Sequence, residues 1–322
     1  MPPVLLRLLA IGLITWIGSE LFRKDEEVSI SKDSDCDKDF KRFNRRIEIS
    51  PDKVEKLRRA HYTIRNKVTS YLQNNTKLPI PKFFIQGSYK TKTLIENTTL
   101  KSDVDLGIFF PSKPGIYADA IQNHIKRALQ GHTRYGVTIK TPCVRLNYVS
   151  DFHIDIPIYF EDINGKTFFG ARGYEWEESD PKGFIEWFKN QTQTKPQLHR
   201  IIKYLKAWLE NVKQKTGRKL PSGLAITLWA IEYYQKDRRD DVAFIQTSLS
   251  ILEYLNNNYK KSWNAFMPVA PYDDILDRLN YSQKDFFYDE LKVMSEIGME
   301  ALTAKNKTQA VKKWRKVFGS KF

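Results

Sequence analysis

Residues 103–110 read Asp-Val-Asp-Leu-Gly-Ile-Phe-Phe and predict a β-strand with one acidic and one apolar face. Side chains alternate between the two faces of a strand, so Asp103 and Asp105 share a face and their carboxylates lie about 6–7 Å apart. Carboxylates gathered on one side of a sheet repel one another unless a cation lies there. Two divalent ions roughly 3.5–4 Å apart, bridged by carboxylates, serve in-line transfer at a phosphate. The strand therefore indicates phosphoryl chemistry.

A second strand repeats this pattern. Residues 152–160 read Phe-His-Ile-Asp-Ile-Pro-Ile-Tyr-Phe, which places Asp155 on the polar face. Asp151 is its rival, because residues four apart on a strand also share a face, but the regular alternation through Pro157 favours Asp155. Reading these acids as the site of an enzyme has a condition: an Asp155 that points away from the other two acids, or a tight salt bridge filling their pocket, would contradict it.

A short turn upstream suits a triphosphate. The expected strand 82–85 runs into Gly87-Ser88, and Thr93 follows shortly after. Glycine lets the backbone approach a phosphate closely, and hydroxyl and N–H groups can donate to its oxygens. The alternative is an ordinary turn from strand to loop.

Downstream, residues 199–206 place three basic side chains, Arg200, Lys203 and Lys206, on roughly one face of an expected helix. The alternative is a solvated amphipathic helix. Ser222 follows a proline and is expected to cap the next helix or to donate to a phosphate. The two roles are compatible, because a helix N-terminus presents free N–H groups.

Composition narrows the class of protein. The chain has 322 residues, a formal charge of +15 and two cysteines without metal-ligand spacing. This excludes a disulfide scaffold and a structural zinc site, and favours polyanionic partners such as nucleotides or nucleic acid. Residues 4–22 are mostly apolar, but the uncharged run 8–19 is short for a membrane span. A cytoplasmic catalytic body with an anchor at residues 4–22 and a mis-assigned start codon both remain open.

The periodicity predicts an α+β protein: a mixed sheet flanked by helices, followed by a C-terminal helical domain, bilobed with a central cleft. We expect residues 1–34 to be an apolar segment and charged linker, 35–185 the catalytic core and 186–322 the helical lobe. The expected strands are 82–85, 103–110, 136–140, 144–149 and 152–160. The expected helices are 50–72, 116–129, 182–191, 196–215, 222–235, 243–258, 282–304 and 309–317.

Together these motifs resemble the DNA polymerase β-like nucleotidyltransferase superfamily. More specifically, Gly87-Ser88-Tyr89, Asp103 to Gly107, Ile154 to Pro157, Arg200 to Trp208 and Trp314 to Gly319 look like the bacterial CD-NTases. These cGAS/DncV-like nucleotidyltransferases serve CBASS anti-phage defence. The resemblance runs from about residue 37 to the end of the chain.

The resemblance implies residue roles and a product. Asp103, Asp105 and Asp155 would hold two Mg²⁺, or Mn²⁺, with Asp155 also taking a proton. ATP and other NTPs would be the substrates. The groups implied to hold the triphosphate are Gly87, Ser88, Thr93, Lys203 and Ser222. The product would be a cyclic di- or trinucleotide, a second messenger for a downstream effector.

Two alternatives and some partners stay open at this point. The same scaffold could transfer nucleotides to RNA ends, to a protein or to a small molecule. The +15 charge also suits a non-catalytic nucleic-acid binder, although a binder of polyanions gains nothing from clustered carboxylates. A regulatory protein partner and activation by nucleic acid are also left open.

Overall fold

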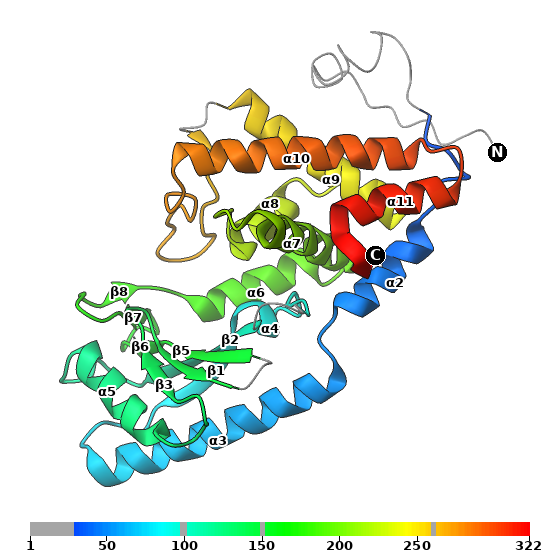
Figure 1. Ribbon diagram of the computed structural model, residues 1–322. Helices are drawn as coiled ribbons and strands as arrows, with labels where there is room; N and C mark the ends of the chain where they lie inside the picture. Colours follow the sequence, from blue (N-terminus) through cyan, green and yellow to red (C-terminus); the bar gives the residue numbers. More distant parts are fainter. Residues whose placement is uncertain (1–28, 97–101, 149–151, 259–261) are drawn as a thin grey trace. The chain divides into compact units, whose positions relative to one another are not determined.

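The computed structural model describes residues 29–96, 102–148, 152–258 and 262–322. These residues form two compact units (Figure 1). The sheet unit comprises Ile47–Thr194 and Phe266–Asp273. The helical unit combines the described residues up to Arg46 with Lys195–Ala265 and Asp274–Phe322. The predicted class, α+β with a mixed sheet and C-terminal helices, is confirmed.

The sheet unit is built on β2, the predicted acidic strand. Its strands are β1 (Lys82–Gln86), β2 (Ser102–Phe110), β3 (Val137–Ile139), β4 (Val144–Asn147), β5 (Phe152–Ile156), β6 (Ile158–Glu161), β7 (Thr167–Gly170) and β8 (Glu177–Glu178). The strand order is β3-β4-β5-β2-β6-β7-β8, and β1 pairs with β2 outside this path. Strand β2 runs parallel to β5 and β6 and antiparallel to β1, so the sheet is mixed.

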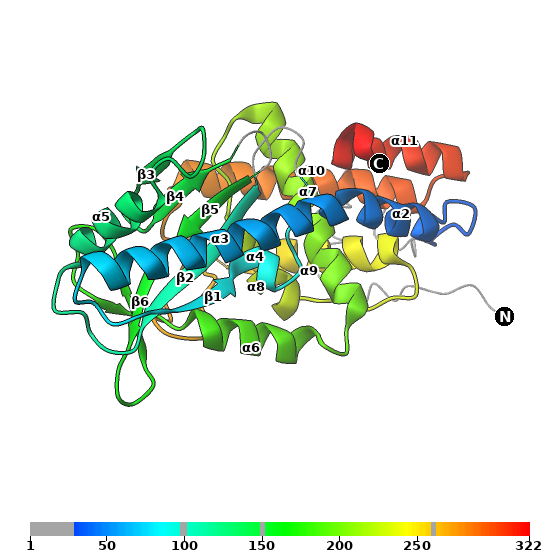
Figure 2. The ribbon, with the colours of Figure 1, turned by 90° about the horizontal axis from the view of Figure 1, so that it is seen from below.

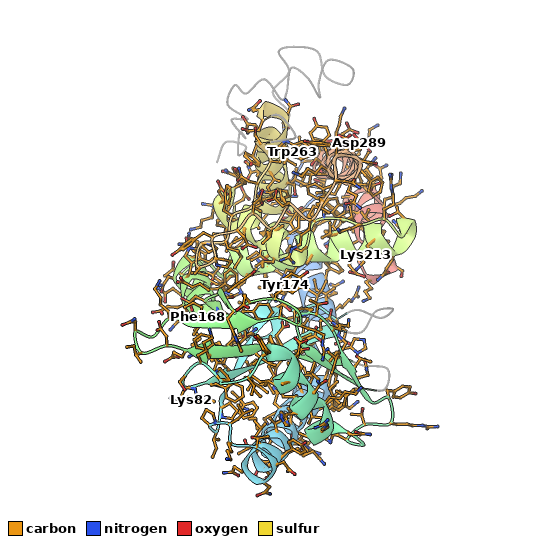
Figure 3. All side chains as sticks on the ribbon, turned by 90° about the vertical axis from the view of Figure 1, so that its left-hand side faces the viewer. Lys82, Phe168, Tyr174, Lys213, Trp263 and Asp289 are labelled. Carbon is orange, nitrogen blue, oxygen red and sulfur yellow. The ribbon has the colours of Figure 1, made fainter. Side chains whose placement is uncertain are left out.

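Pro157 divides the expected strand 152–160 into β5 and β6. Proline has no N–H to donate to a ladder. Its carbonyl still accepts from the amide of Ile108 at 2.9 Å, so both halves stay beside β2. The hairpin β7–β8 was not predicted; its Phe168, labelled in Figure 3, stacks on Phe160 of β6 with ring centroids 4.8 Å apart.

Helices α3 (Pro51–Asn75) and α5 (Ala118–Leu129) cover one face of this sheet, and Figure 2 shows α3 running across the strands. Ser50 caps α3 as predicted, accepting a hydrogen bond from the amide of Lys53, and Pro51 fills the first helical position. The apolar face of β2 packs on these helices, with Val104, Leu106 and Ile108 fully buried. Burying one face fixes the register, because a slip of one residue would move the acids into the core.

The helical unit surrounds an aromatic cluster. Its helices are α2 (Asp37–Ile47), α7 (Pro196–Thr216), α8 (Gly223–Glu232), α9 (Asp240–Asn257), α10 (Tyr281–Leu302) and α11 (Lys307–Phe318). Phe40 of α2 is fully buried and contacts five rings at centroid distances between 4.8 and 5.8 Å, those of Tyr204, Phe244, Trp314, Phe318 and Phe322. Helix α2 was not predicted, yet it supplies the ring at the centre of this core.

The observed units differ from the sequence-based boundaries at both junctions. Residues up to Arg46 group with the helical unit, and α6 (Pro181–Thr192) groups with the sheet. Part of the stretch expected to be a linker is packed: Ser34 is fully buried and donates to the carbonyl of Leu302 at 2.6 Å, whereas Lys32 and Asp33 are exposed. The amide of Ser31 donates to the same carbonyl at 3.0 Å, so the end of the expected linker is tied to the last residue of α10.

The apolar residues 4–22 lie outside the described residues. In the described part of the chain, no helix combines the length and apolar character that crossing a membrane requires.

Candidate active site

The three predicted acids lie on one face of the sheet. Asp105 and Asp155 are direct partners in the parallel register of β2 and β5, and Asp103 is the partner of His153. Their strand neighbours point into the core on the opposite face, including the fully buried Ile154. We call the face with Asp103, Asp105 and Asp155 the acidic face. Asp155 therefore points toward the other two acids, while its rival Asp151 lies outside the described residues.

One row of paired residues crosses four strands at this point. Gln86 of β1 pairs with Asp105, Asp105 with Asp155, and Asp155 with Arg145 of β4. Residues directly paired across strands have neighbouring side chains on the same face. The row therefore places a single arginine at the end of a pair of carboxylates.

Arg145 binds the acidic face tightly. Its Nε and Nη2 donate to the two oxygens of Asp155, each at 2.6 Å, and Nη2 also lies 3.1 Å from Oδ1 of Asp103. The Arg145 and Asp155 side chains are 17% and 16% exposed, so the pair is well shielded, whereas Asp103 is 58% exposed. A bidentate arginine–carboxylate pair is among the strongest contacts between side chains.

This contact corrects the sequence-based picture, which expected the pocket to be free of a salt bridge. Sequence reasoning missed Arg145, although a signal was present. Arg145 stands between Val144 and Leu146, both fully buried, so alternation on that strand places it on the acidic face. Both oxygens of Asp155 accept hydrogen bonds from the guanidinium, so Asp155 could take a proton only after Arg145 releases one of them. Its role as a base stays a prediction.

The carboxyl of Asp105 is the most perturbed acid of the group. Burial, together with the charges of Asp155 and Asp103, raises its pKa from 3.8 to about 7, and Arg145 offsets only part of this. On the far side of Asp105, the amide of Gln86 donates to the hydroxyl of Tyr159 at 2.9 Å. Tyr159 is itself buried against Phe109, with ring centroids 4.6 Å apart. Asp105 thus lies between a desolvated aromatic region and two like charges.

The predicted Gly87-Ser88 turn directly follows β1. Gly87 begins the short helix α4 (Gly87–Lys90) with φ of +66°, a conformation that favours glycine. The Ser88 carbonyl accepts from the amides of Thr93 and Leu94 at 2.9 and 3.0 Å. Thr93 is 1% exposed, and its hydroxyl lies 2.9 Å from that of Thr91. Thr93 therefore braces the turn from inside, and its predicted contact with a ligand remains a prediction.

The other two predicted ligand residues, Lys203 and Ser222, belong to the helical unit. Lys203 lies on α7 and is 6% exposed. Ser222 caps α8 as predicted, its hydroxyl oxygen accepting from the amide of Ala225 at 3.1 Å. Lys206 runs over the start of α8, since a Cβ on Gly223 would lie 3.3 Å from its Cε. Burial lowers the pKa of Lys206 to about 7.

Arg200, the third member of the expected basic face, has a structural role. Its guanidinium makes a bidentate contact with the fully buried Asp240, at 2.6 and 2.8 Å. Gln197 and Tyr204 donate to the same carboxylate. The arginine is therefore committed to tying α7 to the start of α9.

The acidic face fits a divalent cation in part. Asp103 is exposed, and the pKa of Asp105 is raised by burial and, second, by the charges of Asp155 and Asp103, which a cation would offset. Asp155 is engaged by Arg145. Within the described ranges, no group of three or more His, Cys, Asp or Glu side chains is arranged to hold a metal ion. Arg145 contacts Asp103 through Oδ1 alone, so Asp103 and Asp105 are better placed than Asp155 to hold a metal.

The segment that carries the acidic face matches a known protein family. Residues 81–159 match the family described as cyclic GMP-AMP synthase DncV-like, nucleotidyltransferase domain. A cyclic GMP-AMP synthase of Escherichia albertii is 29% identical over 210 residues, which cover 60% of this chain and 47% of that protein. The match thus spans about half the length of that relative. A cyclic AMP-AMP-AMP synthase of an Acinetobacter strain is 23% identical over 300 residues, 86% of this chain and 82% of that protein.

The fold agrees with these matches. The structure of Vibrio cholerae DncV cyclic AMP-GMP synthase with the linear intermediate pppA(3′,5′)pG superimposes with a TM-score of 0.75 and 14% identity, covering 89% of this chain and 96% of that one. The matched segment 81–159 contains the Gly87-Ser88 turn, both acidic strands and Arg145. Over residues 81–159 the chain thus matches the DncV-like nucleotidyltransferase family, and it is similar to bacterial cyclic oligonucleotide synthases.

Proposed function

We propose that this protein joins nucleoside triphosphates into a cyclic oligonucleotide and releases pyrophosphate at each step. The observation that carries the proposal is the acidic face, where Asp103, Asp105 and Asp155 gather beside the Gly87-Ser88 turn within the segment that matches nucleotidyltransferases. The cyclic product would act as a messenger for a downstream effector in anti-phage signalling of the CBASS type.

The residues of the sheet unit would have separate roles in binding metal, in binding phosphate and in positioning. Asp103 and Asp105 would hold Mg²⁺ or Mn²⁺. When bound, such an ion supplies Lewis acidity to the phosphate oxygens and lowers the pKa of the attacking ribose hydroxyl. Gly87 keeps the backbone of the turn against Asp105, and Ser88 provides a hydroxyl donor. Asp155, held by Arg145, would orient the acidic face.

The helical unit would contribute the remaining triphosphate contacts. Lys203 would supply a positive charge, and Ser222 a hydroxyl at the start of α8, where unpaired N–H groups also favour an anion. Nucleotide binding by these two residues is part of the proposal.

The test is direct product analysis. The purified chain is incubated with the four labelled NTPs and Mg²⁺ or Mn²⁺, and products are identified by mass spectrometry. A small product that resists phosphatase supports cyclisation, whereas label on RNA or protein supports a transferase of another kind. Replacing both acids, Asp103→Ala with Asp105→Ala, should reduce turnover by more than about 10³-fold with the fold retained. Asp289→Ala, at the exposed α10 position labelled in Figure 3, is the matched control and should leave turnover unchanged.

A further inference from the structure

The guanidinium of Arg145 places a positive charge on the acidic face. Arg145 contacts two of the three predicted metal ligands, with both oxygens of Asp155 at 2.6 Å and one oxygen of Asp103 at 3.1 Å. Arg145 and Asp155 are direct partners in the antiparallel register of β4 and β5, so the backbone itself places the guanidinium there. A surface salt bridge can open at little cost, but this pair is more than four-fifths buried.

The contact has a consequence for any metal that uses Asp155. A divalent ion prefers carboxylate oxygens, and both oxygens of Asp155 already accept hydrogen bonds from the guanidinium. The ion and the guanidinium are also like charges, so they repel one another at this range. Each oxygen of Asp155 keeps a further lone pair, but an ion that used it would lie close to the guanidinium. Binding through Asp155 is therefore opposed unless Arg145 gives up part of its contact.

We propose that Arg145 and a divalent cation compete for Asp155, so that Arg145 is a positioning residue that sets how tightly the acidic face binds metal. The inference rests on the proposed function in one respect, namely that metal binds through Asp103 and Asp105. With the guanidinium in place, Asp155 is held in line with Asp105 and part of the negative charge is neutralised. When the ion binds through Asp155, the guanidinium moves off that carboxylate.

The experiment measures Mn²⁺ binding to the full chain by calorimetry, without nucleotide. Arg145→Gln removes the positive charge, so Mn²⁺ should bind more tightly, with a Kd lower by about tenfold or more. The repulsion from one unit charge near ~5 Å, at an effective dielectric constant of ~20, is larger than the free energy of a tenfold change in Kd. Arg145→Lys keeps the charge but loses the bidentate fork, so its Kd should fall by a smaller factor. Arg172→Gln is the matched control in the same unit: it removes an arginine that contacts Asp119, and its Kd should not change.

Thermal unfolding gives a second readout that a merely structural arginine would not produce. Arg145→Gln should lower Tm in EDTA, where the acids repel one another, and the deficit should shrink at saturating Mn²⁺, because a ligand that binds the folded state more tightly stabilises it more. An equal deficit in EDTA and in Mn²⁺, or an unchanged or higher Kd, would overturn the proposal. Should Arg145→Gln fail to fold, the Kd of Arg145→Lys decides alone: a lower value supports competition, and an unchanged or higher one refutes it.

One further variant separates this inference from the proposed function. Asp103→Asn should weaken Mn²⁺ binding strongly. If it does not, the ion binds elsewhere and the metal role of the acidic face fails. If it does, while Arg145→Gln leaves the Kd unchanged, only the competition is refuted.

Discussion

The Cα of Gly87 lies directly against the carboxylate of Asp105. A Cβ built on Gly87 would stand 2.1 Å from Oδ2 of Asp105, a distance at which something must shift. Glycine is required here for two reasons: there is no room for a Cβ, and the φ of +66° favours a residue without one. The turn and the central acid of the cross-strand row are thus fitted to each other, and the turn cannot change without moving Asp105.

Gly87→Ala should therefore damage both stability and turnover. The positive φ alone costs about 1 kcal/mol for a residue with a Cβ. Gly131 provides the matched control, because its φ is +73° and nothing lies within 4 Å of its Cβ position. Denaturant unfolding should show a loss of about 1 kcal/mol in Gly131→Ala and a clearly larger loss in Gly87→Ala. Equal losses, with normal turnover in both variants, would show that the contact with Asp105 does not matter.

The raised pKa of Asp105 predicts a pH-dependent stability. Between pH ~4 and the folded pKa of about 7, the unfolded chain ionises this carboxyl while the folded chain keeps the proton, so stability falls as pH rises through this window. Asp105→Asn removes the ionisation. In EDTA, we compare the free energy of unfolding of Asp105→Asn with that of the natural sequence. The difference should shift in favour of the variant by on the order of 2–4 kcal/mol as the pH rises from 5 to 8.

The control for this comparison is Asp289→Asn on the exposed surface of α10, which should track the natural sequence within about 0.5 kcal/mol at both pH values. If the two variants show the same pH dependence, the raised pKa of Asp105, with burial as its first cause and the neighbouring charges as its second, is wrong.

Ser222 has a structural role that can be separated from its proposed ligand role. Ser222→Ala removes the cap of α8 and should cost about 1 kcal/mol of stability. Ser50→Ala removes the corresponding cap of α3 and should cost a similar amount. Steady-state kinetics should show a several-fold higher KM for NTP in Ser222→Ala alone. Should the two variants have the same KM, Ser222 is a cap and nothing more.

Lys203 is tested in the same manner. Lys203→Met keeps the buried aliphatic stem and removes the charge, so it should raise the KM for NTP with a smaller effect on stability than truncation would have. Lys213, labelled in Figure 3, lies on the same helix and is exposed; Lys213→Met is the control and should leave KM unchanged. A similar KM in all three proteins would remove Lys203 from the binding site.

Local signals predicted most of the elements. The alternation in residues 103–110 was sufficient for β2, since only one register buries Val104 and Leu106. Ser50-Pro51 marked the start of α3, and the 3.6-residue period located α7 close to its observed bounds. Helix α2 escaped prediction because it is short and strongly charged, and it is stabilised by burying Phe40 among rings distant in sequence.

The sequence by itself determined that three acids would share one face of a sheet, because alternation along a strand is a property of the backbone. It also carried the motifs that mark the family. Only the tertiary structure decided which side chains stand beside those acids. Arg145 meets Asp155 through pairing of β4 with β5, and Arg200 is drawn to Asp240 through packing of α7 on α9. Both outcomes depend on contacts between segments whose register no local pattern encodes, and the first of them leaves Asp155 bound to an arginine.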